Sequence, residues 1–162
     1  MCGISGYLDV RYDEVTGRRL LMSMNENLHH RGPDGSGIWT DTDSGVGLGH
    51  TRLSIVGHGE AGAQPMTSHS GRYVITFNGE IYNFRELRIL LEDCNYQFRG
   101  SSDTEVLLGS IETWGLDEAL PRLEGMFAFA VFDKKVQEFF LVRDRLGEKP
   151  LYLGWGDHGH IG

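Results

Sequence analysis

The apolar positions of this chain follow two spacings, one typical of helices and one typical of strands. A spacing of three and four residues recurs in several segments, and short β-prone runs fill much of the sequence between them. The first helical segment runs into Arg31-Gly32-Pro33-Asp34-Gly35, a sequence typical of a helix stop and a turn. We therefore expect helices over residues 16–30, 83–94, 101–114 and 117–123.

The strand pattern is interrupted by turn sequences, so most strands are expected to pair as hairpins. Asn78-Gly79 favours positive φ and predicts a break after the β-prone run 72–77. Asn83 and Glu86 have the spacing of a capping box for the next helix. Hairpins together with two groups of helices predict antiparallel sheets covered by helices. We expect strands over residues 3–10, 36–40, 46–50, 52–56, 72–77, 80–82, 126–133, 138–143 and 151–153.

The composition narrows the class of protein. The 162 residues fit one domain with a hydrophobic core, and a net charge of −8 argues against nucleic acid or an anionic membrane as partner. The chain has no membrane-length apolar run and no signal peptide, and its two cysteines do not make a disulfide framework. We therefore expect a cytoplasmic protein in which Cys94, within a helical pattern, is buried and inert.

Two local patterns suggest ligand sites but lack the context that each would need. Residues 57–62 match G-x-G-x-x-G, but Pro65 follows where a dinucleotide site requires a helix. Asp41 and Asp43 do not belong to a complete calcium-binding loop, and the histidines show no metal-ligand spacing. The residues therefore predict neither a metal site nor a nucleotide site.

Cys2 is the first candidate for catalysis. If Met1 is removed, Cys2 carries both a thiol and a free α-amine. A thiolate is a strong nucleophile, and an α-amine with a reference pKa of about 7.7–8.0 is a suitable base near neutral pH. Nucleophile and base would then lie on one residue. By itself, the pattern also fits an ordinary cysteine close to a chain terminus.

Several separated motifs give this cysteine a family context. They are Met1-Cys2-Gly3-Ile4, Arg31-Gly32-Pro33-Asp34-Gly35, Gly49-His50-Thr51-Arg52-Leu53-Ser54-Ile55, Phe77-Asn78-Gly79-Glu80-Ile81-Tyr82-Asn83, Ser102-Asp103-Thr104-Glu105, Leu123-Glu124-Gly125-Met126-Phe127-Ala128 and Arg143-Asp144-Arg145-Leu146-Gly147-Glu148-Lys149-Pro150-Leu151-Tyr152. In order, spacing and content, this set closely resembles the glutaminase domain of asparagine synthetases. Those domains are class II glutamine amidotransferases with an N-terminal nucleophile, and the resemblance covers essentially the whole chain.

The resemblance implies an α+β fold of the N-terminal nucleophile hydrolase type. This is a four-layer αββα sandwich, in which two mainly antiparallel sheets lie between helices. Residues 1–162 would form one glutamine amidotransferase type-2 domain, truncated and C-terminally incomplete, because similar domains continue past the equivalent of Gly162. The Ser-Gly-Gly-x-Asp-Ser loop of a synthetase domain does not occur in the sequence. Missing strands would leave sheet edges exposed, so a homodimer is a further expectation.

The resemblance also implies three catalytic residues. Cys2 would attack the side-chain amide of glutamine, and its own α-amine would act as the base. Asn78 and Gly79 would donate hydrogen bonds to the oxyanion, one from a side-chain amide and one from a backbone N–H. From the residues alone, a hairpin turn at Asn78-Gly79 remains an alternative.

A second set of residues would bind glutamine. Arg52 matches the family's clamp for the α-carboxylate, which a guanidinium binds bidentately. Asp103 and Glu80 match the acceptors of the α-ammonium. A surface ion pair for Arg52 and a helix N-cap for Asp103 stay open as other roles. The whole implied binding set is Arg52, Leu53, Ile55, Val56, Asn78, Gly79, Glu80 and Asp103.

The implied reaction is hydrolysis of glutamine to glutamate and ammonia through a Cys2 thioester. This domain would need no metal or organic cofactor, whereas ATP and Mg²⁺ are expected only in the missing C-terminal synthetase domain that would use the ammonia. The acceptor, aspartate or another carboxylate, stays open. Two other functions also stay open: a non-catalytic relative that keeps the fold for binding or regulation, and an N-terminal nucleophile hydrolase acting on a different amide.

Overall fold

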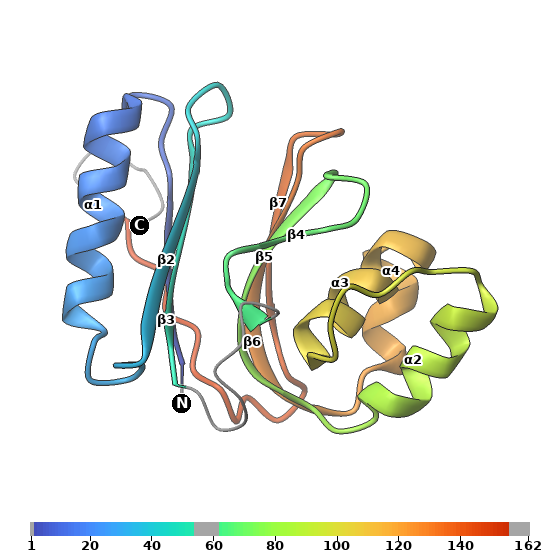
Figure 1. Cartoon of the computed structure of the whole chain (residues 1–162). Helices are drawn as coiled ribbons and strands as arrows, with labels where there is room; N and C mark the ends of the chain where they lie inside the picture. Colours follow the sequence, from blue (N-terminus) through green and yellow to red (C-terminus); the bar gives the residue numbers. More distant parts are fainter. Residues whose placement is uncertain (1, 54–61, 156–162) are drawn as a thin grey trace.

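The fold stacks two antiparallel sheets face to face and covers each with helices. The structure is a computed structural model that describes residues 2–53 and 62–155. Figure 1 shows the layers in order: helix α1, a first sheet, a second sheet, and the group of helices α2, α3 and α4. This arrangement confirms the expected αββα sandwich.

The first sheet is built by the N-terminal third of the chain. Its strands are β1 (Gly3–Leu8), β2 (Gly35–Asp41) and β3 (Val46–Arg52), in the order β1-β3-β2. Helix α1 (Glu14–Asn27) lies on its outer face and begins at Asp13, whose carboxylate accepts a hydrogen bond from the Thr16 N–H.

One buried side chain fastens the first helix to its sheet. The Asn25 amide of α1 donates to the Ser36 hydroxyl at 2.9 Å and to the Gly37 carbonyl at 3.1 Å, both on β2. Its oxygen accepts from the Ser5 hydroxyl of β1 at 2.8 Å. Since these bonds reach two strands, they fix the first sheet as one rigid layer under α1.

The second sheet contains β4 (Met66–Thr67), β5 (Tyr73–Ile81), β6 (Gly125–Asp133) and β7 (Glu138–Arg143), in that order. Its outer face carries α2 (Phe84–Asp93), α3 (Asp103–Trp114), α4 (Leu116–Ala119) and the 3₁₀ helix η2 (Leu120–Arg122). Among the described residues, no helix combines the length and the apolar character needed to cross a membrane.

Two hydrophobic cores hold the layers together. The larger lies between the second sheet and its helices and includes Ile75, Phe129 and Leu107. The smaller lies between the two sheets and is formed by Val46, Leu48, Val74, Ala130 and Phe132. Strand β5 serves both cores because successive side chains point to opposite faces.

The predicted break at Asn78-Gly79 is wrong. Strand β5 continues from Tyr73 to Ile81 and pairs with β6 along its whole length, with Asn78 opposite Ala128 and Gly79 opposite Phe127. Gly79 is absent from the positive-φ residues of the described chain. Pairing with a long neighbouring strand has overridden the local turn preference.

Other local predictions need correction. The Asn83 side chain makes no capping bond; it donates to the Arg122 carbonyl and accepts from the Glu124 N–H instead. Residues 151–153 form no strand. Cys94 is exposed at the end of α2, not buried, because the apolar face of that helix passes through Leu87 and Leu91. The expected strand 52–56 is described only at Arg52 and Leu53, where β3 ends.

Candidate active site

The side chains of β3 that face the space between the sheets change from apolar to polar along the strand. Leu48 of β3 belongs to the core between the sheets, so His50 and Arg52, two and four residues later, point to the same side. Strand β1 pairs antiparallel with β3, with Gly3 opposite Thr51 and Ile4 opposite His50. Continuing that register puts Cys2 beside Arg52 and on the same face.

Strand β5 supplies the opposite wall. Val74 lies in the core between the sheets, so Thr76 and Asn78 face the first sheet as well. The Thr76 hydroxyl donates to the Gly49 carbonyl at 2.9 Å, and the next residue, Phe77, hydrogen-bonds through its backbone to His50. A step of one residue along β5, from Thr76 to Phe77, therefore matches a step of one residue along β3, from Gly49 to His50. By the same progression, Asn78 lies toward the end of the space between the sheets that holds Arg52 and Cys2.

The backbone beside Cys2 is fixed by a buried hydrogen bond. The Gly3 N–H donates to the Thr51 hydroxyl at 3.1 Å, and that hydroxyl donates in turn to the Leu28 carbonyl at 3.3 Å. A Cβ at Gly3 would lie 2.5 Å from the Thr51 oxygen, so only glycine allows this approach. Cys2 itself is half-buried and forms no disulfide.

Arg52 is held by the turn that the sequence placed after the first helix. The Asp34 N–H donates to the Arg52 carbonyl at 2.9 Å, and Pro33 forms a parallel bridge with Arg52. The guanidinium lies against Gly62, where a Cβ would come within 3.1 Å of one of its nitrogens. Leu53 follows, half-buried, whereas Ile55 and Val56 lie outside the described residues.

Asn78 and Gly79 offer two neighbouring hydrogen-bond donors. Asn78 is 5% exposed, and within the described chain no hydrogen bond of its side-chain amide is found. Gly79 lies so close to β6 that a Cβ would come within 2.3 Å of the Met126 carbonyl oxygen. The hairpin-turn alternative is therefore excluded, and the glycine is required by the approach of β6.

Asp103 joins the helical layer to β5. Its carboxylate accepts from the Ile81 N–H at 3.1 Å and from the Thr104 N–H at 2.8 Å. The helix N-cap is Ser102, whose hydroxyl accepts from the Glu105 N–H, so the N-cap role considered for Asp103 is wrong. Burial raises the pKa of Asp103, and the nearby Glu80 raises it further. Two carboxylates that repel each other in this way favour a cation between them.

Comparison with known proteins supplies the family. The glutamine amidotransferase domain family matches residues 1–161. The chain belongs to this family. Asparagine synthetase B [glutamine-hydrolyzing] of Escherichia coli K12 is 42% identical over 161 residues, which are 99% of this chain and 28% of that protein. Asparagine synthetase [glutamine-hydrolyzing] 3 of Bacillus subtilis 168 is 42% identical over 154 residues, 94% of this chain and 24% of the relative.

These relatives are longer than this chain. This glutamine amidotransferase domain spans about a quarter of the length of the relatives it matches, and it corresponds to their glutamine amidotransferase portion. Two solved structures share its fold. An allosteric regulatory enzyme of purine biosynthesis has a TM-score of 0.81 at 24% identity and covers 99% of this chain and 41% of its own. The glutamine phosphoribosylpyrophosphate amidotransferase of B. subtilis, complexed with ADP and GMP, has a TM-score of 0.76 at 23% identity, with 99% and 40% covered.

One further buried polar residue at this end of the space between the sheets was not singled out from the sequence. His50 is 2% exposed, and its Nε2 atom is the one buried side-chain nitrogen or oxygen without a partner among the described residues. Burial is the main reason that the pKa of His50 is lowered to about 4; the Phe77 backbone acts to raise it, and the Arg52 cation also acts to lower it. The imidazole is therefore neutral at pH 7. Its position two residues before Arg52 on a strand was the available signal.

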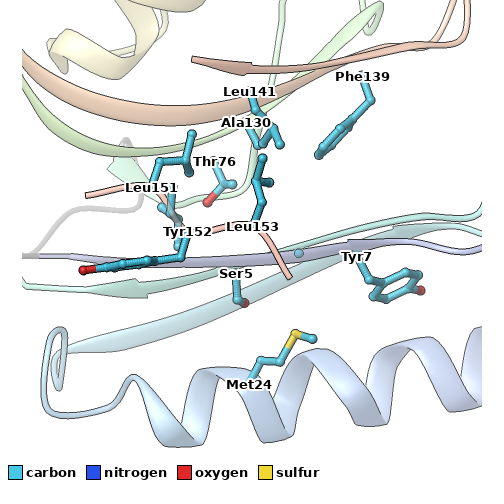
Figure 2. A pocket seen from close by; sticks show the side chains of 12 residues that line it. Ser5, Tyr7, Met24, Thr76, Ala130, Phe139, Leu141, Leu151, Tyr152 and Leu153 are labelled. Carbon is cyan, nitrogen blue, oxygen red and sulfur yellow. The ribbon is translucent and has the colours of Figure 1, made fainter. Parts of the chain in front are cut away.

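A hollow between the sheets lies beside the candidate site and does not include it. Its volume is about 210 Å³, and Figure 2 shows Leu151 and Leu153 running between Ser5 of the first sheet and Leu141 of the second. None of the predicted site residues lines it; its lining on β1 begins at Ile4 and continues to Tyr7, and on β5 it includes Thr76. Within residues 2–53 and 62–155, no three histidine, cysteine or carboxylate side chains are grouped as a metal site.

Proposed function

We propose that this domain hydrolyses glutamine to glutamate and ammonia with Cys2 as the nucleophile. One observation carries the proposal: Cys2, Arg52 and Asn78 lie on facing walls at one end of the space between the sheets. Asp103 and Gly79 lie at the adjoining edge of β5. A thiol, a guanidinium, an amide and a carboxylate are the groups needed to hold an amino acid and attack its side-chain amide.

Both charged ends of free glutamine find a complementary group. The Arg52 guanidinium binds the α-carboxylate with two parallel hydrogen bonds. Asp103 and Glu80 accept the α-ammonium, which relieves the repulsion that raises the pKa of Asp103. Leu53, Ile55 and Val56 are assigned backbone contacts to the substrate by family resemblance alone.

The chemistry proceeds through a thioester. The Cys2 thiol loses its proton to the α-amine of the same residue, and the sulfur bonds to the amide carbon. The Asn78 amide and the Gly79 N–H donate to the resulting oxyanion. When the C–N bond breaks, the α-ammonium protonates the leaving nitrogen, which departs as ammonia. Water then adds to the thioester carbon, the C–S bond breaks, and glutamate and the thiol are released.

The product ammonia needs a consumer. We extend the proposal to a synthetase domain, which the names of the asparagine synthetase relatives suggest. Activation of an acceptor carboxylate with ATP and Mg²⁺ in that domain is what the family resemblance implies. Aspartate and other carboxylates remain open as acceptors. Both cysteines are free, which suits the reducing cytoplasm, and we propose that compartment. The homodimer stays a prediction for sedimentation measurements.

Glutamate release tests this function directly. The chain, with Met1 removed and at its full natural length, should release glutamate and ammonia from glutamine. Cys2→Ala should abolish the release, because no other group replaces the sulfur nucleophile. Cys94→Ala is the matched control and should keep parent activity, since that thiol is exposed at the end of α2. Activity that survives Cys2→Ala would exclude the proposed mechanism.

A further inference from the structure

The open edge of β5 presents a row of backbone N–H groups. Beyond the short β4, which pairs only with Val74 and Ile75, no strand covers this edge in the described chain. Tyr82 donates to Glu124 beside β6, so even-numbered residues of this stretch bond toward β6. The N–H groups of Phe77, Gly79 and Ile81 therefore point to the open edge.

Side chains fill two of these three positions. The Phe77 N–H donates to Oε1 of Gln64 at 2.6 Å, and the Ile81 N–H donates to Asp103 at 3.1 Å. Between them, the Gly79 N–H has no partner among the residues that the structure describes. A single N–H is thus left available, and it is the one that the proposed reaction assigns to the oxyanion.

Gln64 is itself firmly placed. Its Nε2 donates to the Thr104 hydroxyl at 3.3 Å, next to Asp103 at the start of α3. Its backbone carbonyl lies against β2, where a Cβ at Gly37 would come within 2.0 Å of the Gln64 oxygen. The Gln64 side chain therefore connects β5 and α3, and its backbone carbonyl contacts β2.

We propose that Gln64 is a positioning residue that prepares the oxyanion site. It fills the hydrogen-bonding position at Phe77 and ties β5 to α3, which fixes the direction of the Gly79 N–H two residues away. Donors aimed in advance at the developing charge lower the barrier more than donors that must reorganise. This inference rests on the proposed glutaminase reaction, but the placement of Gln64 can be tested without it.

Amide hydrogen exchange tests the placement. In the parent chain, the Phe77 amide should be protected and the Gly79 amide should exchange quickly. Gln64→Leu should speed exchange at Phe77 about tenfold or more, as expected for losing one hydrogen bond. Gln64→Glu keeps an acceptor for Phe77, and the Thr104 hydroxyl can donate to the new carboxylate, so protection should return. Unchanged Phe77 exchange in Gln64→Leu would overturn the inference, whether or not the chain hydrolyses glutamine.

Kinetics separate positioning from simple structural support. Gln64→Leu should lower kcat about tenfold or more, with partial recovery in Gln64→Glu, while inhibition by the product glutamate changes less than about twofold. The matched control is Ser68→Ala, because the Ser68 hydroxyl accepts from the Tyr73 N–H on the same edge, away from Gly79. Ser68→Ala should speed exchange at Tyr73 and leave kcat near that of the parent. An equal fall of kcat in Gln64→Leu and Ser68→Ala would contradict a positioning role, whereas a parent chain without glutaminase activity would refute the function alone.

Discussion

The two ends of the space between the sheets are built from the same strands but differ in their side chains, which are apolar at one end and polar at the other. At one end, Leu48 and Val74 pack with Phe132 into a dry core. At the other, the same faces of β3 and β5 present His50 and Asn78 within four residues of those positions. A change in side-chain type along one face of a strand therefore replaces an apolar packing surface with a polar one, which we propose as the reactive end.

The two ends also contribute differently to the stability of the fold. Burying the apolar end stabilises the fold by about 25 cal/mol for each Å² of apolar surface. The polar end works against the fold, because the Nε2 of His50 is buried without a partner in residues 2–53 and 62–155, and such a group costs about 1–3 kcal/mol. Mutations at the two ends should therefore separate stability from activity.

The largest effect is expected at the apolar end. Leu48→Ala removes a fully buried side chain from the core between the sheets and should lower the free energy of unfolding by about 3–5 kcal/mol. The chain that remains folded should keep its activity. Denaturant unfolding gives the first value and kcat per folded molecule the second. Leu146→Ala is the control, since Leu146 is 85% exposed, and it should change stability by less than about 0.5 kcal/mol.

The polar end should show the opposite result. Asn78→Leu removes one oxyanion donor and should lower kcat about 10²–10³-fold, with little loss of stability because no hydrogen bond joins this amide to another described residue. Thr76→Val is the matched control on the same face of β5. It removes the bond to Gly49 and should cost about 1 kcal/mol of stability with little change in kcat. Similar kcat values for Asn78→Leu and the parent would remove Asn78 from the reaction.

His50 should make the stability of the fold depend on pH. Its pKa is about 4 in the fold and about 6.5 when unfolded, so between these values the unfolded chain binds more protons. Stability that is present above pH 6.5 should therefore fall as the pH drops toward 4, by a total on the order of 3 kcal/mol. His50→Phe should remove this part of the acid slope in unfolding measured at each pH. An identical slope in parent and variant would assign the acid sensitivity to other groups.

The smallest effect concerns substrate binding. Arg52→Lys keeps the charge but loses the bidentate geometry, so KM for glutamine should rise about tenfold while kcat changes little. Steady-state kinetics distinguish the two constants. The comparison variant is Arg145→Lys, because the only bonds of Arg145 within the described part of the chain are to the backbone carbonyls of Leu123 and Pro121; its KM should equal that of the parent. An unchanged KM in Arg52→Lys would leave the carboxylate without its proposed partner.

Sequence patterns predicted elements better than junctions. The helix at the start and the hairpin of β6 and β7 follow directly from apolar spacing, since each buries one face locally. The predicted strand break at Asn78-Gly79 is wrong because pairing with β6, which is distant in the sequence, imposes the conformation of these two residues. Asn83 likewise bonds to residues 122–124 and not to its own helix. Partners that are remote along the chain leave no local periodicity to read.

The site shows the same limit. The family motifs predicted Cys2, Arg52 and Asp103 as site residues, which stays a prediction, whereas no motif singled out Gln64, and His50 had only its position two residues before Arg52 as a signal. Gln64 acts through two hydrogen bonds that exist only after β5 and α3 have come together. The prediction that Cys94 is buried is wrong. A helical pattern gives the spacing of the apolar residues, but it does not show how far a given position lies from the buried face of the helix.

The most direct measurement compares the chemical labelling of the two cysteines of the chain. The Met1-free protein is treated with a glutamine analogue that carries a diazoketone in place of the amide, and the alkylated residue is located by peptide mass spectrometry. The account predicts an adduct on the half-buried Cys2, slowed by added glutamine, and none on the more exposed Cys94. Labelling that favours Cys94, or labelling of Cys2 that glutamine does not slow, would contradict a glutamine site at this end of the sheets.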